Sequence, residues 1–201
     1  FKSADKLKYN SNSRKLAELE DEPIMLEAEI EGEFPENSYP ADFVLTLKKD
    51  AQVMFIRNDS NAEYYNGKLG KVIDINPKGT VVVEDQEGNT IAVTPCEWEN
   101  VQYALNEESG EIEPEVIGKF RQIPLKVAWA ITIHKSQGLT FDKVIIDAGS
   151  AFAFGQVYVA LSRCRSLEGI SLDSPIRMSS IYTDGHVADF NARQPEYEAV
   201  Q

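Results

Sequence analysis

Short β-like runs separated by turn sequences fill residues 46–120, and they constrain the fold of this chain more than any other feature. The runs cover residues 51–57, 69–75, 80–85, 90–94, 101–105 and 115–122. Residues 76–79 and 86–89 lie between three of them and have compositions typical of tight turns. Strands that are this short and closely spaced favour antiparallel pairing, so we predict a small β-barrel over residues 46–120.

The pattern changes after Pro124. Residues 127–135 are apolar enough to be buried and fit either a strand or a helix. Residues 143–147 and 169–172 are typical of buried strands. Between them, residues 153–163 carry an apolar stripe at helical spacing (Ala153, Val157, Ala160 and Leu161). A strand, a helix and a strand in this order favour a parallel α/β sheet. We expect a further short helix over residues 184–190.

The first 45 residues are polar and mostly acidic. Residues 27–36 alternate glutamate with apolar side chains, which fits an edge strand or a solvated linker held to the body by residues 24–26. We therefore divide the chain into three parts. Residues 1–45 begin an α/β domain and include the acidic linker, residues 46–120 form an inserted β-barrel, and residues 121–201 complete the α/β domain.

The distribution of charge matters for the class of partner. The formal net charge of −13 argues against a polyanionic partner for the chain as a whole. Residues 119–165, however, carry seven basic and two acidic side chains. Phosphate contacts depend on a field that falls off over about 8–10 Å in physiological salt, so a locally basic segment can still bind a polyanion. A mixed, solvated face is the other interpretation.

Cysteine usage and hydropathy bound the compartment. Cys96 and Cys164 are isolated and fit neither a zinc pattern nor a disulfide framework, which indicates a reducing cytoplasm. No stretch approaches 18 consecutive apolar residues, so we expect no membrane span. With two histidines and no Cys/His cluster, we predict no metal ligands in this sequence.

Polar donors cluster within residues 132–138. Thr132, His134, Lys135, Ser136 and Gln137 can all hold a phosphodiester backbone without reading bases. Gly138 allows the backbone to approach a phosphate, although a glycine at a helix end is the other interpretation.

Arg163 is the candidate for phosphoryl chemistry. An arginine that stabilises the charge on a transferred phosphoryl group raises rates by roughly 10³–10⁵ in other nucleotide hydrolases. The alternative is a cation that stabilises the carbonyl end of its own helix. Gln156 precedes Arg163 by seven residues, so a helix would put both on one flank.

Residues 129–142 (the motif V segment) resemble motif V of the Pif/RecD-type branch of superfamily-one helicases, and residues 155–169 (the motif VI segment) are similar to motif VI. Residues 1–5 look like the strand and turn that follow motif IV there. Residues 47–58 and 65–72 look like the small Src-homology-3 (SH3) barrel of that branch. The resemblance implies an α/β fold: a RecA-like second motor domain, with a parallel sheet and helices, interrupted by an SH3-like antiparallel β-barrel.

The same resemblance implies the C-terminal half of an ATP-dependent DNA helicase, which couples ATP hydrolysis to movement on single-stranded DNA and duplex unwinding. It implies ATP and Mg²⁺ as cofactors of the full-length enzyme. The implied partners are single-stranded DNA and the N-terminal motor domain of the same chain. We assign Arg163 as catalytic. The ATP-binding candidates are Gln137, Gly138, Gln156 and Arg163, and the nucleic-acid candidates are Thr132, His134, Lys135 and Ser136.

A phosphate-binding loop is missing from the sequence. No Gly-x-x-x-x-Gly-Lys-Ser/Thr occurs in the 201 residues, and Gly67-Lys68 lacks the upstream glycine. We therefore expect these residues alone neither to bind ATP tightly nor to hydrolyse it. A non-catalytic module with a decayed motor domain, binding nucleic acid or protein, is the alternative. We interpret Asp147 as structural. Tyr64 and Tyr65 fit base stacking and barrel packing equally.

Overall fold

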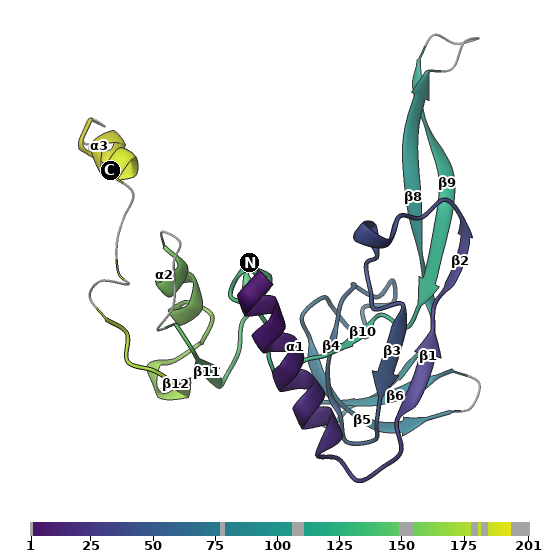
Figure 1. Cartoon of the computed structure of the whole chain (residues 1–201), viewed down its shortest axis with the longest axis horizontal. Coiled ribbons are helices and arrows are strands. Elements are labelled where there is room, and N and C mark those ends of the chain that lie inside the picture. The colour runs from purple at the N-terminus through teal and green to yellow at the C-terminus, as the bar shows by residue number, and fades with distance from the viewer. Residues whose placement is uncertain are drawn as a thin grey trace. The chain divides into compact units, whose positions relative to one another are not determined.

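The computed structural model describes residues 2–76, 79–105, 111–148, 155–177, 181 and 185–193. The chain divides into two compact units, Phe1–Ala130 and Ile131–Gln201, whose elements are shown in Figure 1. None of the helices in the described parts of the chain is long and apolar enough to cross a membrane.

The first unit is mostly antiparallel sheet. Its elements are α1 (Lys2–Ala17), β1 (Ile24–Glu27), β2 (Glu29–Gly32), the 3₁₀ turn η1 (Glu36–Ser38), β3 (Val44–Leu47), β4 (Gln52–Phe55), β5 (Leu69–Ile75), β6 (Val81–Asp85), β7 (Thr90–Val93), β8 (Cys96–Leu105), β9 (Ile112–Gln122) and β10 (Leu125–Val127). Its largest sheet has the order β10-β4-β5-β6-β7, a second has the order β2-β9-β8, and β1 pairs with β3.

The core of the first unit follows from strand alternation. Val81 and Val83 of β6 are fully buried, while Glu84 between Val83 and Asp85 is exposed. Successive side chains of a strand point to opposite faces, so one face of the five-stranded sheet collects the apolar side chains. Phe55, Val72 and Val93 lie in the same buried cluster, against which Leu16 of α1 packs.

The predicted strands form, but the predicted barrel does not. Among the described residues, the five-stranded sheet has β10 and β7 as its edges, and no closed barrel is found. The sequence suggested that residues 101–105 and 115–122 complete the barrel. They belong instead to a long hairpin, paired from Cys96↔Gln122 to Leu105↔Ile112, which extends away from the five-stranded sheet (Figure 1). Alternation identifies a strand but not the sheet that it joins.

Two details of the N-terminal region also differ from expectation. Residues 2–5 are the first turn of α1, so the predicted strand and turn at residues 1–5 is wrong for them; Phe1 lies outside the described residues. Of the two interpretations of residues 27–36, the edge strand is correct over β2, which pairs with β9 from Glu29↔Arg121 to Gly32↔Gly118.

The second unit contains η2 (His134–Ser136), β11 (Val144–Ile146), α2 (Gln156–Leu161), η3 (Leu167–Gly169), β12 (Ile170–Leu172) and α3 (Gly185–Arg193). β11 and β12 are parallel, which confirms the strand, helix and strand order. Val157 and Ala160 of α2 pack with Ile146 and Ala148 in a small core, whereas Ala153 lies outside the described residues. Together, the two units give an α/β chain whose sheets are mostly antiparallel.

Candidate functional site

The centre of the motif V segment is a tight turn rather than a strand or a long helix. The Ser136 N–H donates to the carbonyl oxygens of Thr132 (3.1 Å) and Ile133 (3.2 Å). The Ser136 hydroxyl also donates to the Ile133 carbonyl (2.7 Å). Gly138 follows with φ 81°, in the left-handed region that favours glycine, and the Leu139 N–H closes the turn on the Ser136 carbonyl (3.0 Å). Val127 ends β10, and His134 and Lys135 lie in the short 3₁₀ helix η2, so neither a strand nor an α-helix spans residues 127–135.

The candidate DNA-binding residues differ in how far they reach solvent. His134, Lys135 and Gln137 are exposed, and Thr132 is half-buried. Ser136 is only 5% exposed, and its hydroxyl is used inside the turn. The structure thus brings these residues together in one turn, with Ser136 on its inner side and His134, Lys135 and Gln137 on its surface.

Arg163 is half-buried just after α2, where its guanidinium is held by three acceptors. Its Nε donates to the Val159 carbonyl (3.0 Å) and its NH1 to the Leu139 carbonyl (3.2 Å). Its NH2 donates to the Ser162 hydroxyl (3.0 Å). The contact with Val159 is the helix-end role considered for this arginine. The contact with Leu139 ties it to the motif V segment, which is 24 residues away in the sequence.

Backbone contacts reinforce this junction between the two motif segments. The Phe141 N–H donates to the Arg163 carbonyl (2.8 Å), and the Arg165 N–H donates to the Phe141 carbonyl (3.0 Å). Gly169 leaves room for this approach, since a Cβ there would lie 2.1 Å from the Asp142 carbonyl oxygen. The exposed side chains of Arg165 and Asp142 also form an ion pair (3.2 Å). The junction therefore holds residues 139–142 beside residues 163–165.

Gln156 is placed differently from the expectation. α2 ends at Leu161, so Gln156 begins the helix and Arg163 lies beyond its end. A shared helical flank therefore does not relate the two side chains, because the chain has left helical geometry before Arg163. Gln156 is half-buried in the first turn of α2, directly after Gly155.

The basic residues of segment 119–165 are divided between the two units. Lys119 and Arg121 lie on β9 in the first unit, where Lys119 pairs with Glu97 (2.8 Å) and Arg121 with Glu29 (3.1 Å). The second unit keeps Lys135, Lys143, Arg163 and Arg165 from this set. The local charge excess inferred from the sequence is therefore divided between the units, and part of it is neutralised by acidic strands.

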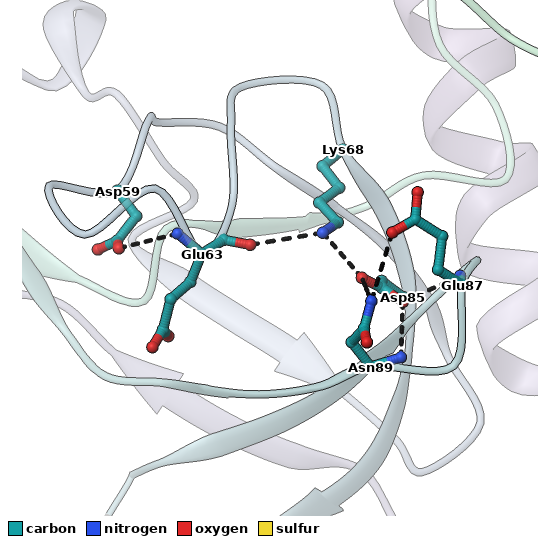
Figure 2. A network of polar contacts seen from close by, with 6 residues as sticks. All are labelled: Asp59, Glu63, Lys68, Asp85, Glu87 and Asn89. Carbon is teal, nitrogen blue, oxygen red and sulfur yellow. Dashed lines mark hydrogen bonds and ion pairs between the residues drawn. The ribbon is translucent and has the colours of Figure 1, made fainter.

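Lys68, which stood out in the sequence beside Gly67, takes part in a structural network (Figure 2). Its ammonium group pairs with Asp85 (2.8 Å), whose side chain is fully buried. Asp85 also accepts hydrogen bonds from the backbone N–H groups of Glu87 (2.9 Å) and Asn89 (2.8 Å) and from the Asn89 amide (3.0 Å). Asp85 thus fixes the turn after β6 and anchors Lys68 to it.

The two tyrosines before Lys68 have separate surroundings. Tyr64 stacks on Phe55, with ring centroids 4.3 Å apart, and burial raises the pKa of its phenol. Tyr65 is 61% exposed. Packing is therefore the correct interpretation for Tyr64, while the Tyr65 ring faces solvent.

Acidification is expected to weaken the first unit through Asp85. The Lys68 ammonium, followed by the Asn89 amide, holds the pKa of the Asp85 carboxyl far below its usual range. The unfolded chain therefore takes up a proton at a higher pH than the folded chain. The stability that Asp85 contributes is complete above the ordinary aspartate pKa of about 4 and is lost as pH falls below it.

The measurement is the free energy of unfolding between pH 6 and about pH 2 for wild type, Asp85→Asn and Lys68→Met. The free energy of unfolding of wild type is expected to fall more steeply with acidification than that of Asp85→Asn. The difference in slope corresponds to the uptake of up to about one proton on unfolding. Lys68→Met should show an intermediate slope, because Asp85 keeps its other donors. Equal slopes for wild type and Asp85→Asn would contradict the assignment.

The described acidic residues do not cluster in a way that could hold a metal ion. Across the described ranges, no group of three or more His, Cys, Asp or Glu side chains could hold one. Asp147, directly after β11, accepts a hydrogen bond from the Ser174 hydroxyl (3.0 Å). That contact joins β11 to the segment after β12.

Two interactions at these sites were missed by reasoning from the sequence. The Leu139 carbonyl, which holds Arg163, is a backbone group and gives no signal in the residue pattern. The Asp85 network had a local signal, since an aspartate before a Gly-Asn turn commonly accepts hydrogen bonds from the backbone that follows.

Comparisons with known proteins relate this region to helicases. Residues 127–167 match the model of the UvrD-like helicase C-terminal domain, a range that includes the motif V segment and the Arg163 junction. The chain is 36% identical over 166 residues to the ATP-dependent DNA helicase Pif1 of Bdellovibrio bacteriovorus, covering 80% of this chain and 36% of that protein.

Solved structures give a similar result. Unliganded Pif1 from Bacteroides sp. superposes with a TM-score of 0.83 at 44% identity, covering 92% of this chain and 42% of that one. The Bacteroides Pif1 helicase in complex with ADP-AlF3 and single-stranded DNA gives a TM-score of 0.74 at the same coverage. The chain spans about a third of the length of the curated Bdellovibrio relative.

Proposed function

The chain belongs to the Pif1 helicase family, and from that relationship we propose that it is the C-terminal region of an ATP-dependent DNA helicase that moves along single-stranded DNA and unwinds duplexes. In this proposal the 201 residues supply the second half of the motor. ATP and Mg²⁺ act in the full-length enzyme, together with an N-terminal motor domain of the same chain. The related Bacteroides protein has been crystallised with ADP-AlF3 and single-stranded DNA, which supports both ligand classes.

One observation carries the proposal: Arg163 binds the Leu139 carbonyl (3.2 Å) and thereby joins the motif VI segment to the motif V segment. A translocase needs the group that senses ATP to be connected to the group that holds DNA. A guanidinium has five N–H donors, and three hydrogen bonds are described for Arg163. A phosphate oxygen can therefore be added without releasing Leu139.

Arg163 is the catalytic residue in this scheme. As charge develops on the γ-phosphoryl oxygens in the transition state, a preorganised guanidinium stabilises it without the cost of reorganising solvent. Gln137, Gly138 and Gln156 complete the proposed contacts to ATP. Mg²⁺ would neutralise phosphate charge in the full-length enzyme, and we assign it no ligand in these residues.

DNA contacts are assigned to Thr132, His134, Lys135 and Ser136. The exposed His134 and Lys135 side chains are suited to direct contact with phosphate oxygens, since such contacts position a backbone without reading its sequence. Ser136 is buried within the turn, so we assign it to the shape of this surface, through its bond to the Ile133 carbonyl.

The domain assignment also belongs to the proposal. A RecA-like second motor domain comprises residues 1–45, with the acidic linker, and residues 121–201. Residues 46–120 form an SH3-like insertion. The parallel pairing of β11 and β12 around α2 supports the motor part, and the short antiparallel strands β4 to β7 support the insertion.

The isolated 201 residues are expected to show no Mg²⁺-dependent ATP hydrolysis with or without single-stranded DNA. They lack a phosphate-binding loop that would cradle the β- and γ-phosphates. The measurement is phosphate release by the purified chain beside a longer protein that includes the proposed N-terminal motor domain. Hydrolysis by the 201 residues that Arg163→Ala abolishes would contradict the proposal. An inactive longer protein would favour the decayed, non-catalytic module.

A further inference from the structure

A buried asparagine on α1 holds the chain immediately before the motif V turn. Asn12 is 8% exposed, on a helix whose neighbouring Asn10 is exposed. Its side-chain oxygen accepts a hydrogen bond from the Ala130 N–H (2.8 Å), and its amide donates to the Ala130 carbonyl (2.9 Å). Both backbone groups of Ala130 are thus satisfied by one side chain that is 118 residues away in the sequence.

A second side-chain amide holds the same segment, residues 128–130 (the strap). The Gln52 side chain on β4 donates to the Ala128 carbonyl (2.9 Å), and the Ala128 N–H donates to the Gln52 carbonyl (3.0 Å). The Asn12 amide also approaches the Val127 carbonyl (3.4 Å). Residues 128–130 are outside any strand or helix, so these contacts replace the hydrogen bonds that a regular element would supply.

The position of this paired contact between Asn12 and Ala130 (the Asn12 clamp) suggests a functional role. Ala130 is the last residue of the first unit, and the turn that contains His134 and Lys135 begins a few residues later. A primary amide pairs with both groups of a peptide residue and fixes its orientation as well as its position. The Asn12 clamp therefore fixes Ala130, the residue from which residues 131–138 continue.

We propose that Asn12 is a positioning residue for the DNA-binding turn of the motif V segment. This inference rests on the proposed function. Asn12 touches neither DNA nor ATP in this scheme; it acts through Ala130. Releasing Ala130 removes the hydrogen bonds that hold the strap, so that His134 and Lys135 meet the phosphate backbone in a less ordered geometry. The cost falls on the response to DNA rather than on the chemistry at ATP.

The test compares Asn12→Ala, Asn12→Asp and Asn10→Ala in the full-length protein. Asn10 is the matched control, because it is the same residue type on the same helix but exposed. Asn12→Asp keeps the acceptor for the Ala130 N–H and places a carboxylate oxygen against the Ala130 and Val127 carbonyls. The readouts are DNA-independent ATPase, the ssDNA concentration for half-maximal stimulation, and hydrogen exchange of amides 130–138 and of β5.

Asn12→Ala is expected to raise the ssDNA concentration for half-maximal stimulation by about tenfold or more, with DNA-independent ATPase within about twofold of wild type. Exchange of amides 130–138 should be faster, while β5 is unchanged. Asn12→Asp should shift the ssDNA concentration and the exchange of amides 130–138 in the same directions, and Asn10→Ala should match wild type. If Asn12→Ala does not fold, Asn12→Asp carries the same comparison.

Two outcomes would overturn the inference: an unchanged DNA response in the Asn12 variants, or an equal loss of DNA-independent and DNA-stimulated activity. The second would indicate a purely structural role. Failure of the proposed function has a separate signature, because wild-type protein would then lack ATPase that responds to single-stranded DNA.

Discussion

Replacing Arg163 with alanine in the full-length protein is expected to lower DNA-stimulated ATP hydrolysis by about 10³-fold or more, while affinity for single-stranded DNA changes little. The loss follows from removing a guanidinium that stabilises charge on the transferred phosphoryl group. The measurement is steady-state ATPase with saturating single-stranded DNA, together with DNA binding by fluorescence anisotropy.

The contacts of Arg163 dictate the controls. Alanine also leaves the Leu139 and Val159 carbonyls without this donor, so a structural effect on the junction accompanies the chemical one. Arg163→Lys keeps the charge but not the planar fork of donors, and it should remain severely impaired. Ser162→Ala removes one acceptor of the guanidinium and should keep most activity. Parallel loss of ATPase and DNA affinity in Arg163→Ala would assign the arginine a folding role alone.

Local patterns in the sequence predicted those parts of the fold that depend on neighbours in the chain. β5, β6 and β7 were found because their alternation and the turns between them are contained within a few residues. β11, α2 and β12 were found for the same reason. The sheet that a strand joins depends on distant residues, so the separation of β8 and β9 from the five-stranded sheet was missed.

Helix α1 shows a different limit of prediction from sequence. Its sequence is rich in Lys, Ser and Asn and has no continuous apolar stripe, so the usual periodic signal of a helix is weak. The residue that attaches α1 most specifically is Asn12. Its partner, Ala130, is distant in the sequence although the two are in contact. A buried amide cannot be told from an exposed one by its position in such a sequence.

The candidate site likewise combines features that local sequence predicts with features that depend on distant residues. The residue types of the motif V and motif VI segments were identifiable because each is a short contiguous stretch. The contact of Arg163 with Leu139, the burial of Ser136 and the end of α2 before Arg163 all depend on three-dimensional packing. Sequence reasoning therefore named the participants, and the structure supplied the connection between them.

Replacing Phe120 with alanine is expected to lower the free energy of unfolding of the first unit by about 3–5 kcal/mol. Phe120 is fully buried on β9. Its ring centroid lies 4.9 Å from that of Tyr39, 5.5 Å from Phe34 and 6.1 Å from Trp98. The substitution removes a ring that these three aromatic side chains share, and the rigid strands around it limit how far the cavity can collapse.

Tyr103 on β8 provides the matched control. It is an aromatic residue on the same hairpin but is 71% exposed, so Tyr103→Ala should change stability by no more than about 0.5 kcal/mol. Urea unfolding followed by tryptophan fluorescence measures both variants. A Trp129→Phe background leaves Trp98, which contacts Phe120, as the only tryptophan reporter. Similar effects from the two substitutions would mean that the aromatic cluster does not anchor the hairpin. The expected difference would show that burial of Phe120, rather than aromatic content, holds β9 to the segment carrying Phe34 and Tyr39.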